Sequence, residues 1–150
     1  MRSQVVFSHT SDEWETPHDL FERLDEEFHF TLDGAATTAN HQCPRWLGPG
    51  GTYPDALTYA PQHEVIWLNP PYSKITQFMG WVEEHSELNK WVLLLPARTD
   101  TRWWHRYIWN SENWEDPYST AEIRFIKGRL KFVGGAASAP FPSVVVIKRP

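Results

Sequence analysis

The sequence predicts an α/β protein whose sheet is mostly parallel and carries an antiparallel strand at its C-terminal edge. Short continuous apolar runs, typical of strands buried on both faces, recur along the 150 residues. Segments with a helical spacing of apolar residues separate the first of these runs, as in parallel sheets, whereas the last runs follow one another without a helix. No repeat or linker divides the chain, so we expect one domain over residues 1–150.

The N-terminal part predicts a helix and then a strand. Thr16 and Pro17 fit the cap and the first position of a helix that runs to about Glu27. The apolar face of this helix comprises Leu20, Phe21, Leu24 and Phe28. Residues 28–32 then alternate apolar and polar, which predicts a strand that ends at the small-residue turn Asp33-Gly-Ala-Ala36.

The middle of the chain begins without a periodic pattern. Residues 37–62 are rich in Gly, Pro, Thr and Asn, and we expect a loop with at most one short strand or helix. Residues 65–68 and 91–95 are compact apolar runs that predict buried strands. Residues 75–86 carry apolar side chains at helical spacing, so a helix separates the two strands.

The C-terminal part predicts one more helix and a series of strands. A short helix is expected over residues 101–109, followed by a polar loop over residues 110–120. Residues 122–126 and 130–133 predict two strands of a hairpin, or one bent strand, and residues 143–148 predict a final buried strand. This run of strands places the antiparallel edge at the C-terminal end of the sheet.

The formal net charge of -5 conceals an uneven distribution of charge. Residues 1–90 contain five basic and 14 acidic residues, whereas residues 91–150 contain nine basic and five acidic ones. An acidic total argues against a nucleic-acid partner, which attracts Lys and Arg. Because the charge is segregated, the C-terminal third can still present a basic surface.

Two basic patterns lie in that C-terminal third. A strand would point every second residue to one face, which here brings together Lys127, Arg129 and Lys131. A helix would stack residues four apart, which here brings together Arg102 and Arg106, with Arg98 one step earlier in the same series. Each pattern fits a polyanion-binding surface and fits an ordinary solvated face equally well.

Composition and cysteine usage exclude several classes of protein. Hydrophobic residues make up 41% and charged residues 22%, as in a folded domain rather than a disordered chain. No apolar run approaches the ~18 residues that span a bilayer, and residues 1–14 are too polar for a secretory signal. Cys43 is the only cysteine, so a reducing cytoplasm is expected. Neither Cys43 nor the seven His residues show a metal-site spacing, so we expect no metal.

The motif Asn69-Pro-Pro-Tyr72 directly follows the strand expected at residues 65–68. Open α/β sheets bind ligands at the carboxyl ends of their strands, which is where this motif falls. Proline lacks an N–H and holds the preceding residue extended, so the Asn69 side-chain oxygen and the Pro70 carbonyl form a stiff pair of acceptors. Such a pair suits an amino group on a planar base stacked on Tyr72. A plain proline-rich loop is the alternative, but the motif arises by chance in only about one such chain in a thousand.

The chain resembles the amino-group methyltransferases that use S-adenosylmethionine (SAM), in which Asn-Pro-Pro-Tyr follows a strand. It is most similar to the phage-type (Dam-like) DNA N6-adenine methyltransferases. The matching blocks are Trp14-Glu-Thr-Pro17, Leu32-Asp-Gly-Ala-Ala36, Asn69-Pro-Pro-Tyr-Ser73, Leu95-Pro-Ala-Arg-Thr-Asp100, Glu122-Ile-Arg-Phe125, Gly128-Arg-Leu-Lys-Phe132 and Pro140-Phe-Pro-Ser143. They extend over nearly the whole chain, and the resemblance implies a minimal Rossmann-like class I fold.

The resemblance also implies a reaction. The target adenine is flipped out of the duplex, and its amine donates to Asn69 and to the Pro70 carbonyl, with Pro71 and Tyr72 completing the catalytic motif. Accepting both hydrogens favours a more tetrahedral nitrogen and stabilises the positive charge that grows there during attack on the methyl group.

The expected cofactor contacts come from several of these blocks and from Asp55, which lies outside them and could bind the adenine or ribose of SAM. They are Trp14, Thr16, Pro17, Asp33, Ala35, Asp55 and Asn69. Asp33 is equally suited to cap the turn that follows it, and Asp33-Gly-Ala-Ala36 lacks the familiar Gly-x-Gly. Thr16 and Pro17 serve equally as a helix start, and Asp55 serves equally as a turn aspartate.

The partner implied by the resemblance is DNA, held by Arg98, Arg102, Lys127, Arg129 and Lys131. The chain leaves little room for a separate target-recognition domain, so we expect a short or loosely defined recognition site, a homodimer, or a separate specificity subunit. Methylation of RNA adenine, of cytosine N4 or of a protein glutamine remains open. So does a degenerate copy that binds SAM or nucleic acid without turnover, because residues 37–62 are short and irregular for a cofactor site.

Overall fold

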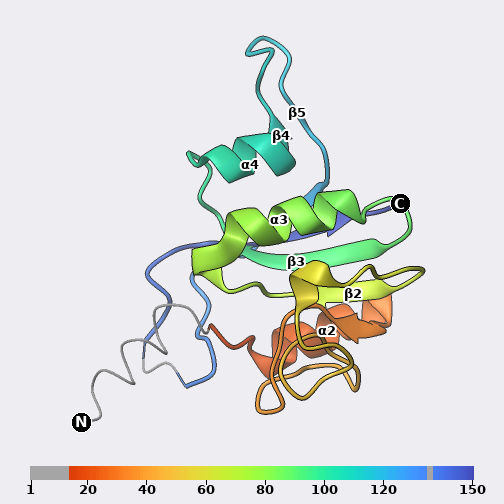
Figure 1. Ribbon diagram of the computed structural model, residues 1–150. Helices are drawn as coiled ribbons and strands as arrows, with labels where there is room; N and C mark the ends of the chain where they lie inside the picture. The colour runs from red at the N-terminus through yellow and green to blue at the C-terminus, as the bar shows by residue number, and fades with distance from the viewer. Residues whose placement is uncertain (1–13, 135–136) are drawn as a thin grey trace.

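The computed structural model describes residues 14–134 and 137–150, which form a five-stranded mixed sheet with helices on both faces (Figure 1). The strand order is β1–β2–β3–β7–β6. The strands span Leu32–Asp33 (β1), Val65–Leu68 (β2), Lys90–Pro96 (β3), Ser143–Lys148 (β7) and Glu122–Phe125 (β6). β1, β2 and β3 are parallel, whereas β7 is antiparallel to both β3 and β6.

The helices lie in two layers. They span His18–Phe28 (α2), Ala56–Thr58 (η1), Tyr72–Lys74 (η2), Ile75–Glu84 (α3) and Arg102–Tyr107 (α4). α3 covers one face of the sheet with α4 beside it, and α2 covers the other face (Figure 1). After α4, a hairpin of β4 (Trp109–Asn110) and β5 (Tyr118–Ser119) projects away from the sheet.

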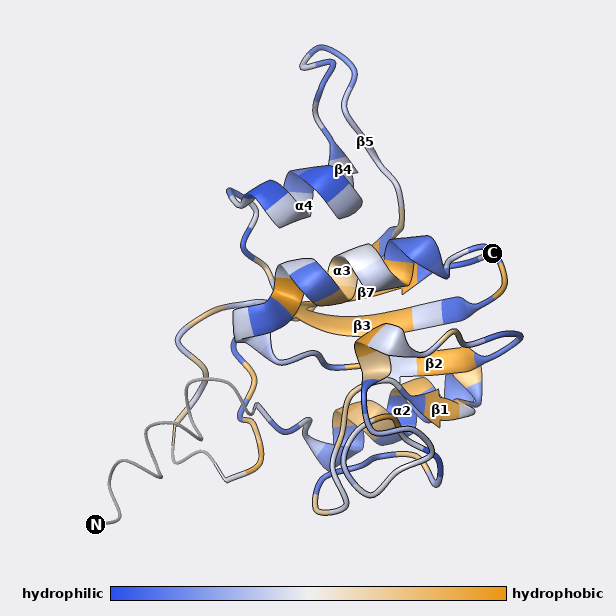
Figure 2. Cartoon of the chain, viewed as in Figure 1, coloured by the Kyte–Doolittle hydropathy of each residue, from blue (hydrophilic) through white to orange (hydrophobic). Residues whose placement is uncertain are grey.

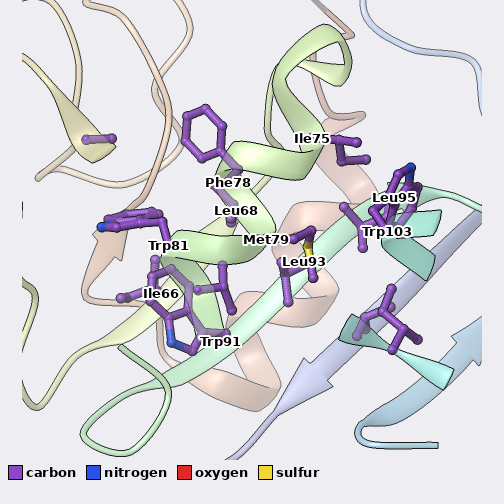
Figure 3. Packing of buried hydrophobic residues seen from close by; sticks show 14 of the residues in the cluster. Ile66, Leu68, Ile75, Phe78, Met79, Trp81, Trp91, Leu93, Leu95 and Trp103 are labelled. Atoms are coloured by element: carbon purple, nitrogen blue, oxygen red, sulfur yellow. The ribbon is translucent and has the colours of Figure 1, made fainter. Parts of the chain in front are cut away.

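Alternate residues of β3 supply the two halves of the core. Trp91, Leu93 and Leu95 pack with α3 and α4, whereas Val92 and Leu94 pack with α2, because successive strand side chains point to opposite faces. Figure 3 shows the first half, in which side chains of α3, β2 and β3 interlock. A strand covered on both faces must be apolar throughout, and Figure 2 shows β3 apolar over most of its length.

The structure confirms the α/β class and most of the predicted elements. The expected strands at residues 65–68, 91–95 and 143–148 and the helix at residues 75–86 are present, with ends shifted by up to two residues. Residues 37–62 contain only η1 and isolated β-bridges, as expected. The three strands are apolar over most of their length because both of their faces are buried, and the helix shows helical spacing because one of its faces packs on the sheet.

The predicted place of the C-terminal strand is wrong. β7 lies inside the sheet between β3 and β6, and β6 is the edge strand. β1, β2, β3 and β6 all run in one direction and β7 runs against them, so the sheet is mixed but mostly parallel, as predicted, with its antiparallel strand inside the sheet rather than at the edge. All six residues of β7 are buried, which fits a central position better than an edge.

Three local predictions are also wrong. Phe28 belongs to α2, which ends when His29 takes a left-handed conformation (φ 56°), so the strand starts only at Leu32. Residues 130–133 form no strand; Gly128 (φ 75°) turns the chain and Phe132 packs into the core from a loop. Residues 110–120 are not wholly loop, since they hold parts of β4 and β5.

Helix α4 is shorter than predicted, and its start is capped. It ends at Tyr107 rather than at Trp109, and the Thr101 side chain accepts a hydrogen bond from the Trp104 N–H. Within the described residues, no helix combines the length and the apolar composition needed to cross a membrane. Residues 1–13 of the polar N-terminal segment lie outside the described residues.

Candidate active site

The candidate site is a cavity of about 340 Å³ at the carboxyl ends of β1 and β2. β1 ends at Asp33 and β2 is followed by Asn69, and because the two strands are parallel neighbours these residues share one edge of the sheet. Asp33, Asn69 and Pro70 all line the cavity, together with parts of the irregular segment after β1. The volume lies in the usual range for small-molecule sites.

The Asn69 side chain is held in one orientation by the chain before α2. Its Nδ2 donates to the Trp14 carbonyl and to Thr16 Oγ1, the latter at 3.2 Å. The Trp14 carbonyl can only accept, so the amide nitrogen must face it. Within the described residues, Asn69 Oδ1 is buried and has no hydrogen-bond partner. A buried acceptor of this kind is costly unless a donor is supplied, and the cavity is where a bound donor would lie.

This arrangement corrects the predicted role of Thr16 as a helix cap. α2 begins at His18, the residue before it is Pro17, and no side chain caps the helix. The Thr16 hydroxyl is instead used by Asn69, and Thr16 is only 2% exposed. The sequence pattern at residues 14–17 therefore positions the motif side chain as well as starting the helix.

The three residues after Asn69 divide between the cavity and the core. Pro70 and Pro71 line the cavity, and Pro70 is buried. Tyr72 is not among the lining residues; its ring meets Phe141 edge-on, with centroids 5.6 Å apart. Its hydroxyl is buried without a partner among the described residues, and burial raises the Tyr72 pKa. The structure thus brings Asn69, Pro70 and Pro71 to the cavity, but not the face of Tyr72.

Asp33 caps the turn that follows it, which is one of the two roles that the sequence left open. Its Oδ1 accepts from the Ala35 N–H at 3.2 Å and its Oδ2 accepts from the Gln42 N–H at 2.9 Å. The carboxylate therefore ties the turn after β1 to the following loop. Burial raises the Asp33 pKa to about 6, although these two hydrogen bonds work in the opposite direction. A cation bound nearby would relieve that cost.

The remaining predicted cofactor residues are distributed unevenly. Trp14, Thr16, Ala35 and Asp55 line the cavity, whereas Pro17 does not. Asp55 caps η1, because its side chain accepts from the Leu57 N–H, and it is otherwise exposed. Asp55 is thus a turn aspartate that also faces the cavity.

The segment after β1 closes the cavity through main-chain contacts. The Ala36 N–H donates to the Leu47 carbonyl at 3.0 Å, and Leu47 donates to the Asp33 carbonyl at 2.9 Å. Gly48 has φ 136°, and a Cβ there would lie 1.9 Å from the Ala36 carbonyl oxygen. Sequence reasoning missed Leu47 and Gly48, since close approach of two backbones leaves no periodic pattern.

A second omission is Lys74, the only Lys or Arg among the described residues that line the cavity. It lies at the end of η2, two residues beyond the motif, and is exposed. Its nearness to Asn69-Pro-Pro-Tyr72 in the sequence is the signal that could have identified it.

The predicted nucleic-acid residues are exposed but do not share the predicted geometry. Lys127, Arg129 and Lys131 lie in a loop, so the strand alternation that grouped them is wrong. Arg102 lies on α4 with Arg106 four residues on, as predicted, and both are exposed.

Arg98 precedes the helix and does not extend this series. Its guanidinium lies over the Phe141 ring, 5.6 Å from the centroid, and Phe141 is also the ring that Tyr72 meets. Other basic residues of this region are neutralised: Arg124 pairs with Glu27 and Lys148 with Glu83.

Comparison with known proteins connects this chain to a family. The model of the DNA N-6-adenine-methyltransferase (Dam) family matches residues 3–150. A protein of Escherichia phage T1 called "DNA N-6-adenine-methyltransferase" is 29% identical over 132 residues, which cover 83% of this chain and 55% of that protein. The chain thus spans about half the length of this curated relative. The match of the family model over nearly the whole chain shows that it belongs to the DNA N-6-adenine-methyltransferase (Dam) family.

Proposed function

We propose that this protein transfers the methyl group of SAM to the exocyclic N6 amine of adenine in DNA. The observation that carries the proposal is the side chain of Asn69, a residue that lines the cavity. Its nitrogen donates to Trp14 and Thr16, while its oxygen is buried and has no partner among the described residues. The family and the name of the phage T1 relative support adenine in DNA as the substrate.

The chemistry of the cavity wall suits SAM. The carboxylates of Glu15, Asp33 and Asp55 offer negative charge to a sulfonium and an ammonium group, and Leu57 and Phe78 offer apolar surface to an adenine ring. When bound, SAM supplies an activated methyl group. The strand–helix–strand arrangement of β2, α3 and β3, with helices on both faces of the sheet, supports a Rossmann-like class I methyltransferase fold.

In this proposal the protein aligns and polarises the amine rather than removing its proton before attack. Asn69 Oδ1 accepts one hydrogen of the amine and the Pro70 carbonyl accepts the other. Both acceptors are fixed before the substrate arrives, so positive charge that develops on nitrogen is stabilised without reorganisation. A neutral amide suffices, because the nitrogen loses its proton after transfer.

The target base must leave the duplex to reach this cavity, at a cost of a few kcal/mol of unstacking. The exposed cations Lys127, Arg129, Lys131 and Arg102, with Arg98 beside the motif, are the groups proposed to hold the phosphates.

The test is transfer of a labelled methyl group from SAM to duplex DNA, single-stranded DNA, RNA and total protein, followed by digestion to nucleosides or amino acids. We expect label in N6-methyldeoxyadenosine. Label in N4-methyldeoxycytidine, in RNA or in methylglutamine would show that the substrate is cytosine, RNA or a protein instead of adenine in DNA. SAM binding without any transfer would identify a degenerate copy.

A further inference from the structure

The tip of the β4–β5 hairpin exposes an aromatic side chain far from the sheet. Trp114 is 83% exposed, although indole is among the side chains most often covered. Hydrogen bonds order the base of this hairpin: the Thr120 N–H donates to the Ile108 carbonyl at 2.8 Å, and Asn110 Nδ2 donates to the Tyr118 hydroxyl at 3.0 Å. Trp114 is therefore carried by a hairpin with a hydrogen-bonded base. This hairpin projects away from the sheet (Figure 1).

The tip is also acidic. Glu112, Glu115 and Asp116 are exposed and lie within two residues of Trp114 in the sequence, and residues 107–123 contain no Lys or Arg. Three carboxylates without a cation repel phosphate, so this part of the molecule is unsuited to a nucleic-acid backbone. An exposed aromatic ring on an acidic segment instead fits an apolar recess with basic residues beside it.

Such a recess lies at the base of the same hairpin, within residues 99–125, which we call the appendage. A groove of about 540 Å³ is lined mainly by apolar side chains of α4, the hairpin base and β6, among them Trp104, Trp109, Ile123 and Phe125. Phe125 is 74% exposed at the end of the edge strand. None of these residues lines the cavity that contains Asn69.

Basic residues lie beside the groove on α4, although no Lys or Arg of the described residues lines the groove itself. His105 lines the groove, and Arg102 lies three residues before it on α4, so the two share a helix face. Arg106 is also exposed on this helix, and among the described residues neither Arg102 nor Arg106 forms an ion pair. An apolar recess with cations beside it is thus carried by the same chain that carries an apolar, acidic tip.

We propose that the groove binds the hairpin tip of a second copy of this chain. A two-fold axis would insert each Trp114 into the partner's groove and set the tip carboxylates against Arg102 and Arg106. This one contact then covers both Trp114 and the apolar groove. Attraction between the acidic tip and the arginines of α4 favours it. The interface leaves the Asn69 cavity open and does not depend on the proposed methyl transfer.

The first test is sedimentation velocity of the full chain over a range of concentrations. We expect a reversible dimer, and at least a tenfold higher dimer dissociation constant for Trp114→Ala and for Phe125→Ser. Leu88→Ala is the matched control, because Leu88 is exposed (48%) but lies outside the appendage, and it should leave the constant unchanged. A wild-type chain that stays monomeric up to about 100 µM, or a dimer unaffected by Trp114→Ala, would overturn the proposal.

The second test locates the contact. Cys43 is the only cysteine and is buried, so Asn113→Cys supplies one reactive thiol for a photo-crosslinker at an exposed position and leaves Trp114 in place. In a mixture of isotopically heavy and light copies, we expect crosslinks from position 113 of one copy to residues 99–109 or 121–125 of the other. Crosslinks confined to one copy, or to other regions of the partner, would contradict the proposed geometry.

Discussion

The loops that follow β1 and β2 line the same cavity but are built in opposite ways. The loop after β2 is six residues long, from Asn69 to Lys74, and two prolines stiffen it. The connection after β1 runs from Gly34 to Glu64 and contains only η1 and isolated bridges. The short loop holds the Asn69 side chain at the cavity, and its prolines make it stiff. The long loop forms part of the cavity wall and is held by main-chain hydrogen bonds between residues distant in the sequence. Substitutions can separate these two contributions.

The largest effect is expected in the long loop, at Gly48. Gly48→Ala places a Cβ 1.9 Å from the Ala36 carbonyl oxygen at a φ of 136°, so the backbone must shift. We expect a loss of about 2–4 kcal/mol, a Tm lower by about 5–15 °C, and weaker SAM binding by calorimetry. Gly128→Ala is the control, since φ is also positive (75°) there but nothing lies within 4 Å. Equal Tm losses in both variants would show that the loop contact does not matter.

The next effect concerns the anchor of the short loop. Thr16→Val removes one acceptor of Asn69 Nδ2 while keeping the shape of the side chain. A buried donor left unpaired costs about 1–2 kcal/mol, so kcat should fall about five- to thirtyfold. KM for DNA should change little, and Thr16→Ser should restore kcat. If Thr16→Ser is as impaired as Thr16→Val, the hydroxyl is not the positioning group.

A pH effect distinguishes the Asp33 carboxylate, at the end of β1, from the backbone of the long loop that follows it. The Asp33 pKa is raised to about 6 by burial, so in the free protein ionisation of Asp33 lowers stability as pH rises from about 4 to 6. A cationic ligand prefers the ionised form, so SAM affinity should fall by up to about tenfold per pH unit below pH 6. Asp33→Asn should bind SAM weakly at all pH values and lose this slope. If the SAM affinity of the wild-type protein did not change between pH 5 and pH 7, Asp33 would be excluded as a cofactor contact.

The smallest effect lies outside both loops. Replacing Lys127, Arg129 and Lys131 together by Ala should weaken DNA binding uniformly across sequences and reduce the salt slope of log Kd by about 2–3. Fluorescence anisotropy at several salt concentrations measures this slope. An unchanged slope would show that these three residues do not contact the phosphates of DNA and are ordinary solvated side chains.

The same contrast between loops explains what the sequence could predict. The strand β3 and the helix α3 could be predicted because burial imposes a pattern of apolar residues on each. The stiffness of the chain at Asn69 could be predicted because proline restricts the residue before it. Three features join residues that are not neighbours in the chain. They are the pairing of β7 with both β3 and β6, the close approach of Gly48 to Ala36, and the hydrogen bond from Asn69 to Thr16. Such contacts depend on the assembled fold and leave no local pattern. The grouping of Lys127, Arg129 and Lys131 is wrong because a glycine turn replaced the expected strand.

The most direct test of the central claim is single-turnover methyl transfer by Asn69→Ala and Asn69→Leu, with SAM binding measured in parallel. If Asn69 Oδ1 is the acceptor that polarises the amine, both variants should bind SAM within a fewfold of the wild type. Their transfer rate should fall by about 10²–10³, the usual cost of removing a preorganised polar group at a developing charge. Transfer at the wild-type rate in a folded Asn69→Ala protein would contradict the account.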